Sequence, residues 1–129
     1  MRSFLLALSL GLSTAVFAHE GHDATPGAVA APHGGKVLSL PEMYLEVVKS
    51  DGAIKVYPLT HELKSIPTSE IKLSVKVELP KQKKASADVS AANDSWTIVV
   101  ESKGAHRYTL FLNTEWKGKM GSTKYTVEK

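Results

Sequence analysis

Cysteine is absent from this chain of 129 residues. The fold therefore contains no disulfide, and its hydrophobic core has to supply the stability. The same absence excludes a thiolate nucleophile, a thiolate metal site and a lipid-modified cysteine. After the first residue only Met43 and Met120 carry thioethers, so a Cu(I) site built on methionine is poorly supplied.

A large excess of charge of one sign is also missing. The chain has 16 basic and 13 acidic residues, which gives a formal net charge of +3. This balance is too mild to indicate nucleic-acid binding, which depends on a dense basic patch. The lysines alternate with apolar residues along predicted strands, except for Lys81, Lys83 and Lys84, which we interpret as a solvated turn. We therefore expect no nucleic-acid partner.

Apolar residues at helical spacing are lacking, whereas strict alternation is frequent. The clearest case is "IKLSVKVEL" at 71–79, where every second residue is aliphatic. Nine alternating residues indicate a half-buried strand. Further strands are predicted near residues 44–49, 54–57, 96–101 and 107–113, with shorter ones at 36–40 and 124–129 and a weak candidate at 84–92.

Turn-forming residues separate these strands. Asp51-Gly52 favours a tight hairpin, and other breaks fall at Pro41, Pro67, Pro80, Asn93-Asp94, Gly104 and Gly118. Seven or eight short strands in one domain predict an all-β fold: an antiparallel β-sandwich, immunoglobulin-like in outline, with a small barrel as the alternative. Because proline cannot donate to a sheet, Pro58 should end its strand or place it at an edge.

The first 18 residues have the pattern of a secretory signal peptide. A positive charge at Arg2 precedes a nearly unbroken apolar run, which closes on small residues at Val16 and Ala18. The run is too short to span a membrane. We expect cleavage after Ala18 and a periplasmic mature form without a membrane segment. Residues 19–32 then form a flexible arm, and residues 33–129 form the β-sandwich domain.

Three of the five histidines lie in "HEGHDATPGAVAAPHGGK" at 19–36. Cleavage after Ala18 makes His19 the amino-terminal residue, whose α-amine and imidazole can chelate one metal ion together. His22 lies three residues further on, and Glu20 and Asp23 add carboxylate oxygens. This donor set suits copper(II) most and zinc next. The alternative is a solubilising arm whose histidines bind nothing.

The remaining histidines have weaker signals. In "PHGGK", His33 is either a third imidazole facing the metal or a cap on a sharp turn that Gly34 and Gly35 permit. His61 should lie in a loop at a strand end, and we include it as a candidate metal ligand beside a structural role. His106 has the parity of Tyr108, so we expect it to point inward as a structural residue.

No catalytic pattern emerges from the sequence. A glycine-rich phosphate loop and a Gly-x-Ser-x-Gly turn are both missing. "HEGH" is not the zinc-protease motif, which needs two histidines four apart on a helix. We therefore expect a protein that is not an enzyme. Trp96 and Trp116 are interpreted as core and edge aromatics rather than as a sugar-binding platform.

The order "PHGGKV", "YLEVV" and "AIKVYPLT" over residues 32–60 resembles a small periplasmic β-domain that opens on a His-Gly-Gly turn. This domain is similar to the accessory domain of heavy-metal efflux adaptor proteins. The resemblance implies a role in heavy-metal resistance near an efflux or metal-transfer partner. It carries over His33 as a functional position, with Glu46 and Tyr57 as structural matches.

A terminal histidine on a β-sandwich also resembles small periplasmic copper-binding proteins and, less closely, copper-dependent oxidases that cut polysaccharides. Together these features predict an exported protein that holds or delivers a divalent transition metal in homeostasis or efflux. The alternative is a non-catalytic periplasmic domain that serves a structural role or docks a partner through an edge strand.

Overall fold

A computed structural model describes residues 30–128 of the chain. The predicted signal peptide and the arm up to residue 29 lie outside these residues. The described part contains nine strands and one 3-10 turn, η1 (Thr68–Glu70). The strands are β1 (Lys36–Ser39), β2 (Tyr44–Ser50), β3 (Ala53–Leu59), β4 (Ile71–Glu78), β5 (Ala85–Ser86), β6 (Asp88–Ala91), β7 (Trp96–Val99), β8 (Arg107–Trp116) and β9 (Lys119–Glu128).

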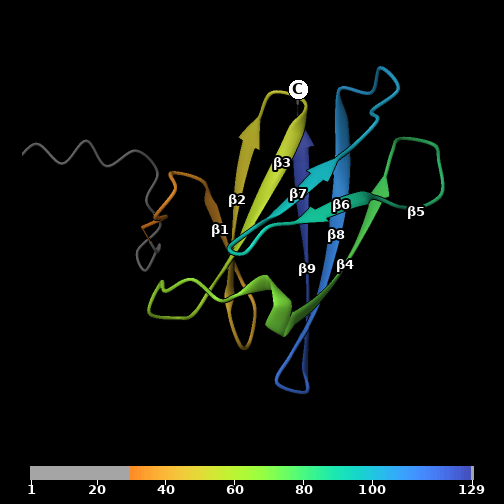
Figure 1. Cartoon of the computed structure of the whole chain (residues 1–129). Helices are drawn as coiled ribbons and strands as arrows, with labels where there is room; N and C mark the ends of the chain where they lie inside the picture. Colours follow the sequence, from red (N-terminus) through yellow and green to blue (C-terminus); the bar gives the residue numbers. More distant parts are fainter. Residues whose placement is uncertain (1–29, 129) are drawn as a thin grey trace, which may run out of the picture.

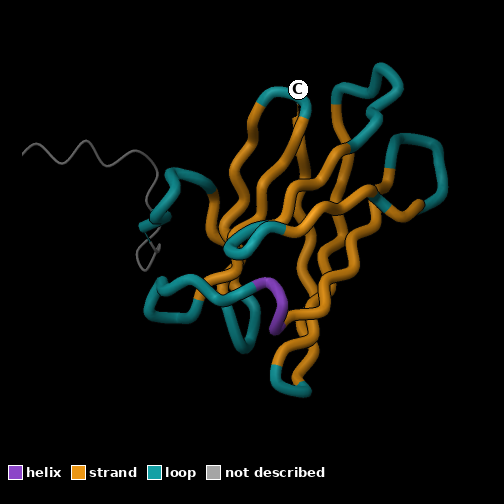
Figure 2. The backbone as a smooth tube through the Cα atoms, viewed as in Figure 1, coloured by secondary structure: helices purple, strands orange, loops and turns teal. Residues whose placement is uncertain are grey.

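The strands form two antiparallel sheets, which confirms the predicted β-sandwich (Figure 1). Sheet A has the order β1-β2-β3-β7-β6, and sheet B has the order β5-β4-β8-β9. The sheets do not close into a barrel, and nine strands are present in the described part where the sequence predicted seven or eight. Figure 2 shows how the chain leaves β3, passes through η1 and enters the other sheet at β4.

Alternating aliphatic residues build the core between the sheets, as the pattern at 71–79 predicts. In β4, Ile71 and Val75 are buried while Lys72 and Lys76 at the alternate positions are exposed. Trp96 is 4% exposed and belongs to the core. Trp116 is only partly buried, at the last position of β8. Burial of an aliphatic side chain such as that of Ile71 or Val75 stabilises the fold by about 1.5–3 kcal/mol.

Two hairpins close where the turn residues predict. Ser50 pairs with Ala53, so Asp51 and Gly52 alone connect β2 to β3, and Gly52 has a φ of 72°. Gly118 follows Lys117 in the β8–β9 turn, where both have positive φ, as a type I′ turn requires.

The prediction for Pro58 is wrong, because β3 continues to Leu59 and does not lie at an edge of sheet A. β3 is a central strand, but its pairing with β7 covers only Ile54 to Val56. Pro58 therefore lies on the part of β3 that has β2 on one side and no ladder with β7 on the other. A proline fits there because no β7 carbonyl requires its missing N–H.

No helix in the span 30–128 is long and apolar enough to cross a membrane.

Candidate functional site

A buried carboxylate lies on the outer side of sheet A. Leu45 and Val47 of β2 point into the core, so Glu46 between them points to the opposite face. That face is normally solvated, yet Glu46 is 0% exposed. The turn that leads into β1 covers it. A buried charge of this kind is tolerated only when hydrogen bonds replace its water.

Residues 33–35 supply these hydrogen bonds. The backbone N–H of His33 donates to Glu46 Oε2 at 2.8 Å, and that of Gly35 donates to the same oxygen at 2.9 Å. The other oxygen, Oε1, lies 2.7 Å from His33 Nδ1. Because an ionised carboxylate only accepts, this contact assigns the ring proton to Nδ1. The carboxylate thus fixes both the turn and the tautomer of His33.

Tyr57 of β3 holds the imidazole from its face. Glu46 and Tyr57 are direct partners in the β2–β3 ladder, so both side chains emerge side by side. The rings of His33 and Tyr57 stack with centroids 3.7 Å apart and planes 11° apart. The His33 side chain keeps 39% of its surface exposed, and no described residue bonds to its Nε2. In the neutral tautomer with the proton on Nδ1, Nε2 carries the lone pair of a ring that is held on one edge and one face.

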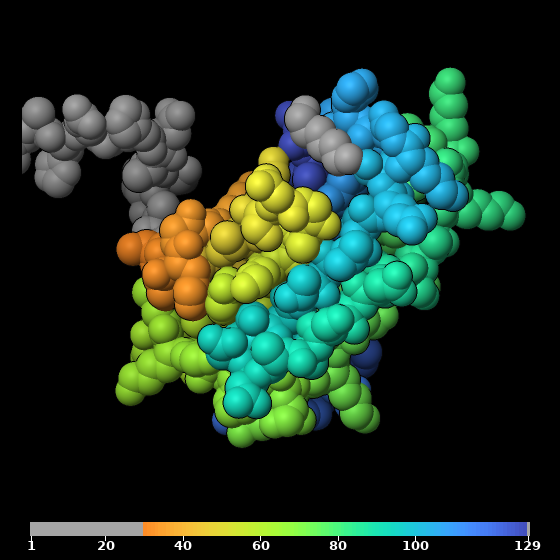
Figure 3. Space-filling view, turned by 45° about the horizontal axis from the view of Figure 1, so that its top comes forward, coloured from red at the N-terminus to blue at the C-terminus, as the bar shows by residue number. Residues whose placement is uncertain are grey.

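Two glycines give the turn its shape. Gly34 has a φ of 73°, a left-handed conformation that other residues adopt only with strain. Gly35 lies so close to β2 that an added Cβ would come within 2.3 Å of the carbonyl oxygen of Val47. Figure 3 shows the first described residues, in orange, packed directly beside the yellow surface of β2 and β3. The sharp turn that the sequence predicts at residues 33–35 thus covers Glu46.

His61 lies at the same side of the sheet but has other contacts. It follows the end of β3 and is exposed, as expected for a loop residue. Its Nε2 is 3.4 Å from the carbonyl oxygen of Leu40, and its ring is tilted against Tyr44 at a centroid distance of 4.8 Å. These contacts fit the structural role that the sequence analysis left open.

The expectation for His106 is wrong. This residue is exposed in the loop before β8, because that strand and its inward alternation begin only at Arg107 and Tyr108. The other candidate ligands, His19, Glu20, His22 and Asp23, lie outside the described residues. Between residues 30 and 128, no three His, Asp or Glu side chains gather closely enough to hold a metal ion.

Comparisons with known proteins give no further assignment. No known protein family matches the chain, and no curated protein or solved structure is significantly similar to it.

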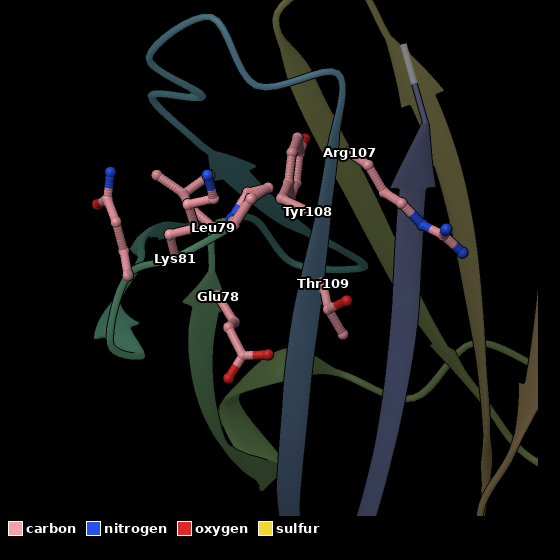
Figure 4. A pocket seen from close by; sticks show the side chains of 8 residues that line it. Glu78, Leu79, Lys81, Arg107, Tyr108 and Thr109 are labelled. Carbon is pink, nitrogen blue, oxygen red and sulfur yellow. The ribbon is translucent and has the colours of Figure 1, made fainter.

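A small pocket of about 240 Å³ lies at the end of β4 (Figure 4), and His33 is not among the residues that line it. Its lining includes Leu79 and Tyr108, while Arg107 points away toward β9, where its Nε lies 3.5 Å from Glu128 Oε1. Burial, together with the neighbouring Tyr125, raises the pKa of the Tyr108 hydroxyl above its usual value of 10.0. Tyr108 is also part of the hydrophobic core cluster, so its ring contributes packing.

The raised pKa of Tyr108 predicts a loss of stability in alkali. The unfolded chain releases this proton near pH 10, before the folded protein does. The free energy of unfolding should therefore stay constant below pH 10 and fall as the pH rises through the folded pKa. Urea unfolding of the wild type and Tyr108→Phe between pH 8 and 11 measures this, and the variant should have the flatter profile. Parallel pH profiles of the wild type and Tyr108→Phe would contradict a raised pKa of Tyr108.

Proposed function

We propose that the mature protein is an exported metal-binding protein that holds or delivers a divalent transition ion, copper(II) first and zinc next. Its role would lie in metal homeostasis or efflux, with a periplasmic efflux or metal-transfer protein as recipient. One observation carries the proposal. His33 donates through Nδ1 to a buried carboxylate and presents an unbonded Nε2.

This arrangement is the one that metal-ligating histidines use. Their second ring nitrogen donates to a carboxylate, which fixes the tautomer, orients the ring and raises the basicity of the ligating nitrogen. Glu46 and Tyr57 together orient His33. The Glu46 carboxylate contacts Nδ1 at the edge of the ring, and the Tyr57 ring stacks on its face. The resemblance of residues 32–60 to efflux accessory domains supports the same reading.

His33 alone cannot retain an ion, so the arm supplies the remaining donors in this proposal. Roughly 11 residues separate His22 from His33, and a chain of that length spans at most about 40 Å. It can therefore fold back and bring His19 and His22 to the imidazole, with Glu20 or Asp23 assisting. Ordering the arm costs about 1–2 kcal/mol per residue, which suits exchangeable binding and delivery.

A titration with Cu(II) and Zn(II) tests this function. The samples are the form that begins at His19, the same form with one alanine placed ahead of His19, and the variants His33→Gln and His61→Gln. Calorimetry should give a dissociation constant at least about tenfold weaker for the extended form and for His33→Gln, because each loses a ligand. His61→Gln reports whether the fourth imidazole also ligates.

The exposed His106 provides the matched control, since His106→Gln removes one imidazole far from the site. Its affinity should equal that of the wild type. Equal affinity of all five forms would contradict the proposal, because binding would then be independent of the terminal chelate and of His33. Failure of the His19 form to bind either ion would contradict it as well.

A docking role is the second candidate, and strand β6 favours it. All four residues of β6 are exposed, and the strand forms one edge of sheet A. Val89 on β6 and Val99 on its neighbour β7 are 38% and 49% exposed. An open edge with exposed valines can accept a strand from a partner protein. This candidate requires no metal, so a negative titration favours it.

A further inference from the structure

Three lysines from separate segments of the chain lie next to one aromatic residue on the outer face of sheet B. Lys76 of β4 and Lys124 of β9 are both direct partners of Phe111 of β8, so the three side chains form one row across the sheet. Lys84, in the loop before β5, places its Nζ 3.8 Å from the centroid of the Phe111 ring. Lys76 and Lys124, which lie on different strands, thus share one row of the sheet, and Lys84 lies next to it.

These ammonium groups lack acidic partners within the described part of the chain. None of the three lies within ion-pair distance of a carboxylate among residues 30–128. The acids on this face of β4, β8 and β9 belong to other rows of the ladder, where Glu78 pairs with Thr109, Glu115 with Lys72 and Glu128 with Arg107. Neighbouring strands are about 4.8 Å apart, so Lys76 and Lys124 flank the row at a backbone separation of about 10 Å. The positive charges of the three lysines therefore reinforce one another at this row.

The same residues line a hollow of about 470 Å³, together with Asn113, Ser122 and Thr123. The hydroxyl of Ser122 donates to Asn113 Oδ1 at 2.7 Å, which leaves the Asn113 amide nitrogen as a donor toward the hollow. All the charged groups of this lining are lysine ammonium groups, and no carboxylate contributes to it. Such a lining is complementary to a negatively charged acceptor.

We infer that this hollow binds an anion that carries two or more phosphate charges. The cations are all lysines, which bind phosphate as point charges, and no arginine lines the hollow. Lysines act as separate point charges, which suits the dispersed charge of a polyphosphate. Phosphates that are free in solution and those of lipid headgroups share this chemistry. The site is independent of the metal site, because it lies on the other sheet.

The test uses the mature protein, tripolyphosphate as the free probe and vesicles with or without anionic phospholipid as the lipid probe. Amide chemical shifts are followed at 0.15 M salt, with sedimentation for the vesicles. Saturable shifts around Phe111, Asn113 and Lys124 are expected with tripolyphosphate, or cosedimentation with anionic vesicles alone if lipid is the source.

The double variant Lys76→Gln/Lys124→Gln should weaken binding about tenfold or more, because two charges beside the anion are lost. The control Lys55→Gln/Lys64→Gln removes the same charge from exposed positions outside the hollow, and its affinity should change less than about twofold. Both variants keep the fold, since all four lysines are exposed. Equal weakening in the two double variants, or no saturable binding of either probe, would overturn the inference.

Discussion

Replacing Glu46 with glutamine should lower the free energy of unfolding by about 3 kcal/mol. The carboxylate is fully buried and accepts three N–H groups through two oxygens. Glutamine has one acceptor oxygen, so its amide nitrogen must face either the backbone donors of His33 and Gly35 or the ring nitrogen of His33. With the amide oxygen on the backbone donors, the amide nitrogen faces Nδ1, and only a shift of the His33 ring proton to Nε2 restores that hydrogen bond. In either case the charge-assisted contacts of the carboxylate are lost. Urea unfolding followed by the fluorescence of the buried Trp96 measures the loss.

Glu78→Gln is the matched control, because Glu78 is exposed on β4 and forms no ion pair with a residue of the described part. Its change should stay within about 0.5 kcal/mol. Glu46→Gln should also weaken metal binding by about 10–100-fold, since the carboxylate orients the His33 ligand. A variant that unfolds like the wild type would show that the turn does not depend on this carboxylate.

The strands could be predicted because their signal is local. In residues 71–79 the alternation alone separates core from solvent, and β4 follows it residue by residue. The prediction was weakest at 84–92, where small residues carry no clear alternation. The structure forms two short strands there, β5 and β6, and all their residues are exposed. Neighbouring strands, rather than local burial, hold this segment in place.

The centre of the candidate site was only partly predictable. His33 and the two glycines stand out in the sequence, but the acid that organises them lies 13 residues away from His33 in β2. Glu46 interrupts the apolar run "YLEVV", and its parity places it on the outer face, where a solvated side chain is typical. The resemblance of residues 32–60 marked it as a structural match without indicating what it contacts. Only the fold shows that the turn covers it. The lysine row around Phe111 was missed for the same reason, since it depends on the register of three strands.

Gly35→Ala should destabilise the protein by about 3 kcal/mol or more, although it adds a single methyl group. The new Cβ would lie 2.3 Å from the Val47 carbonyl oxygen and 2.7 Å from Val48 Cγ2. The first of these atoms belongs to the backbone of a central strand, so the turn must move instead. That movement breaks the N–H contact from Gly35 to Glu46 and leaves the buried carboxylate short of a donor.

Gly34→Ala separates this steric effect from backbone strain. A Cβ at Gly34 meets no atom within 4 Å, so its cost is the left-handed φ of 73° alone, about 1–2 kcal/mol. Urea unfolding of both variants should therefore rank Gly35→Ala as the less stable protein. Amide exchange should also show the residue 33–35 turn opening in Gly35→Ala, because its covering contacts are lost. The reverse ranking would mean that the turn does not press against β2, and His33 would then lack the fixed orientation that the metal site requires.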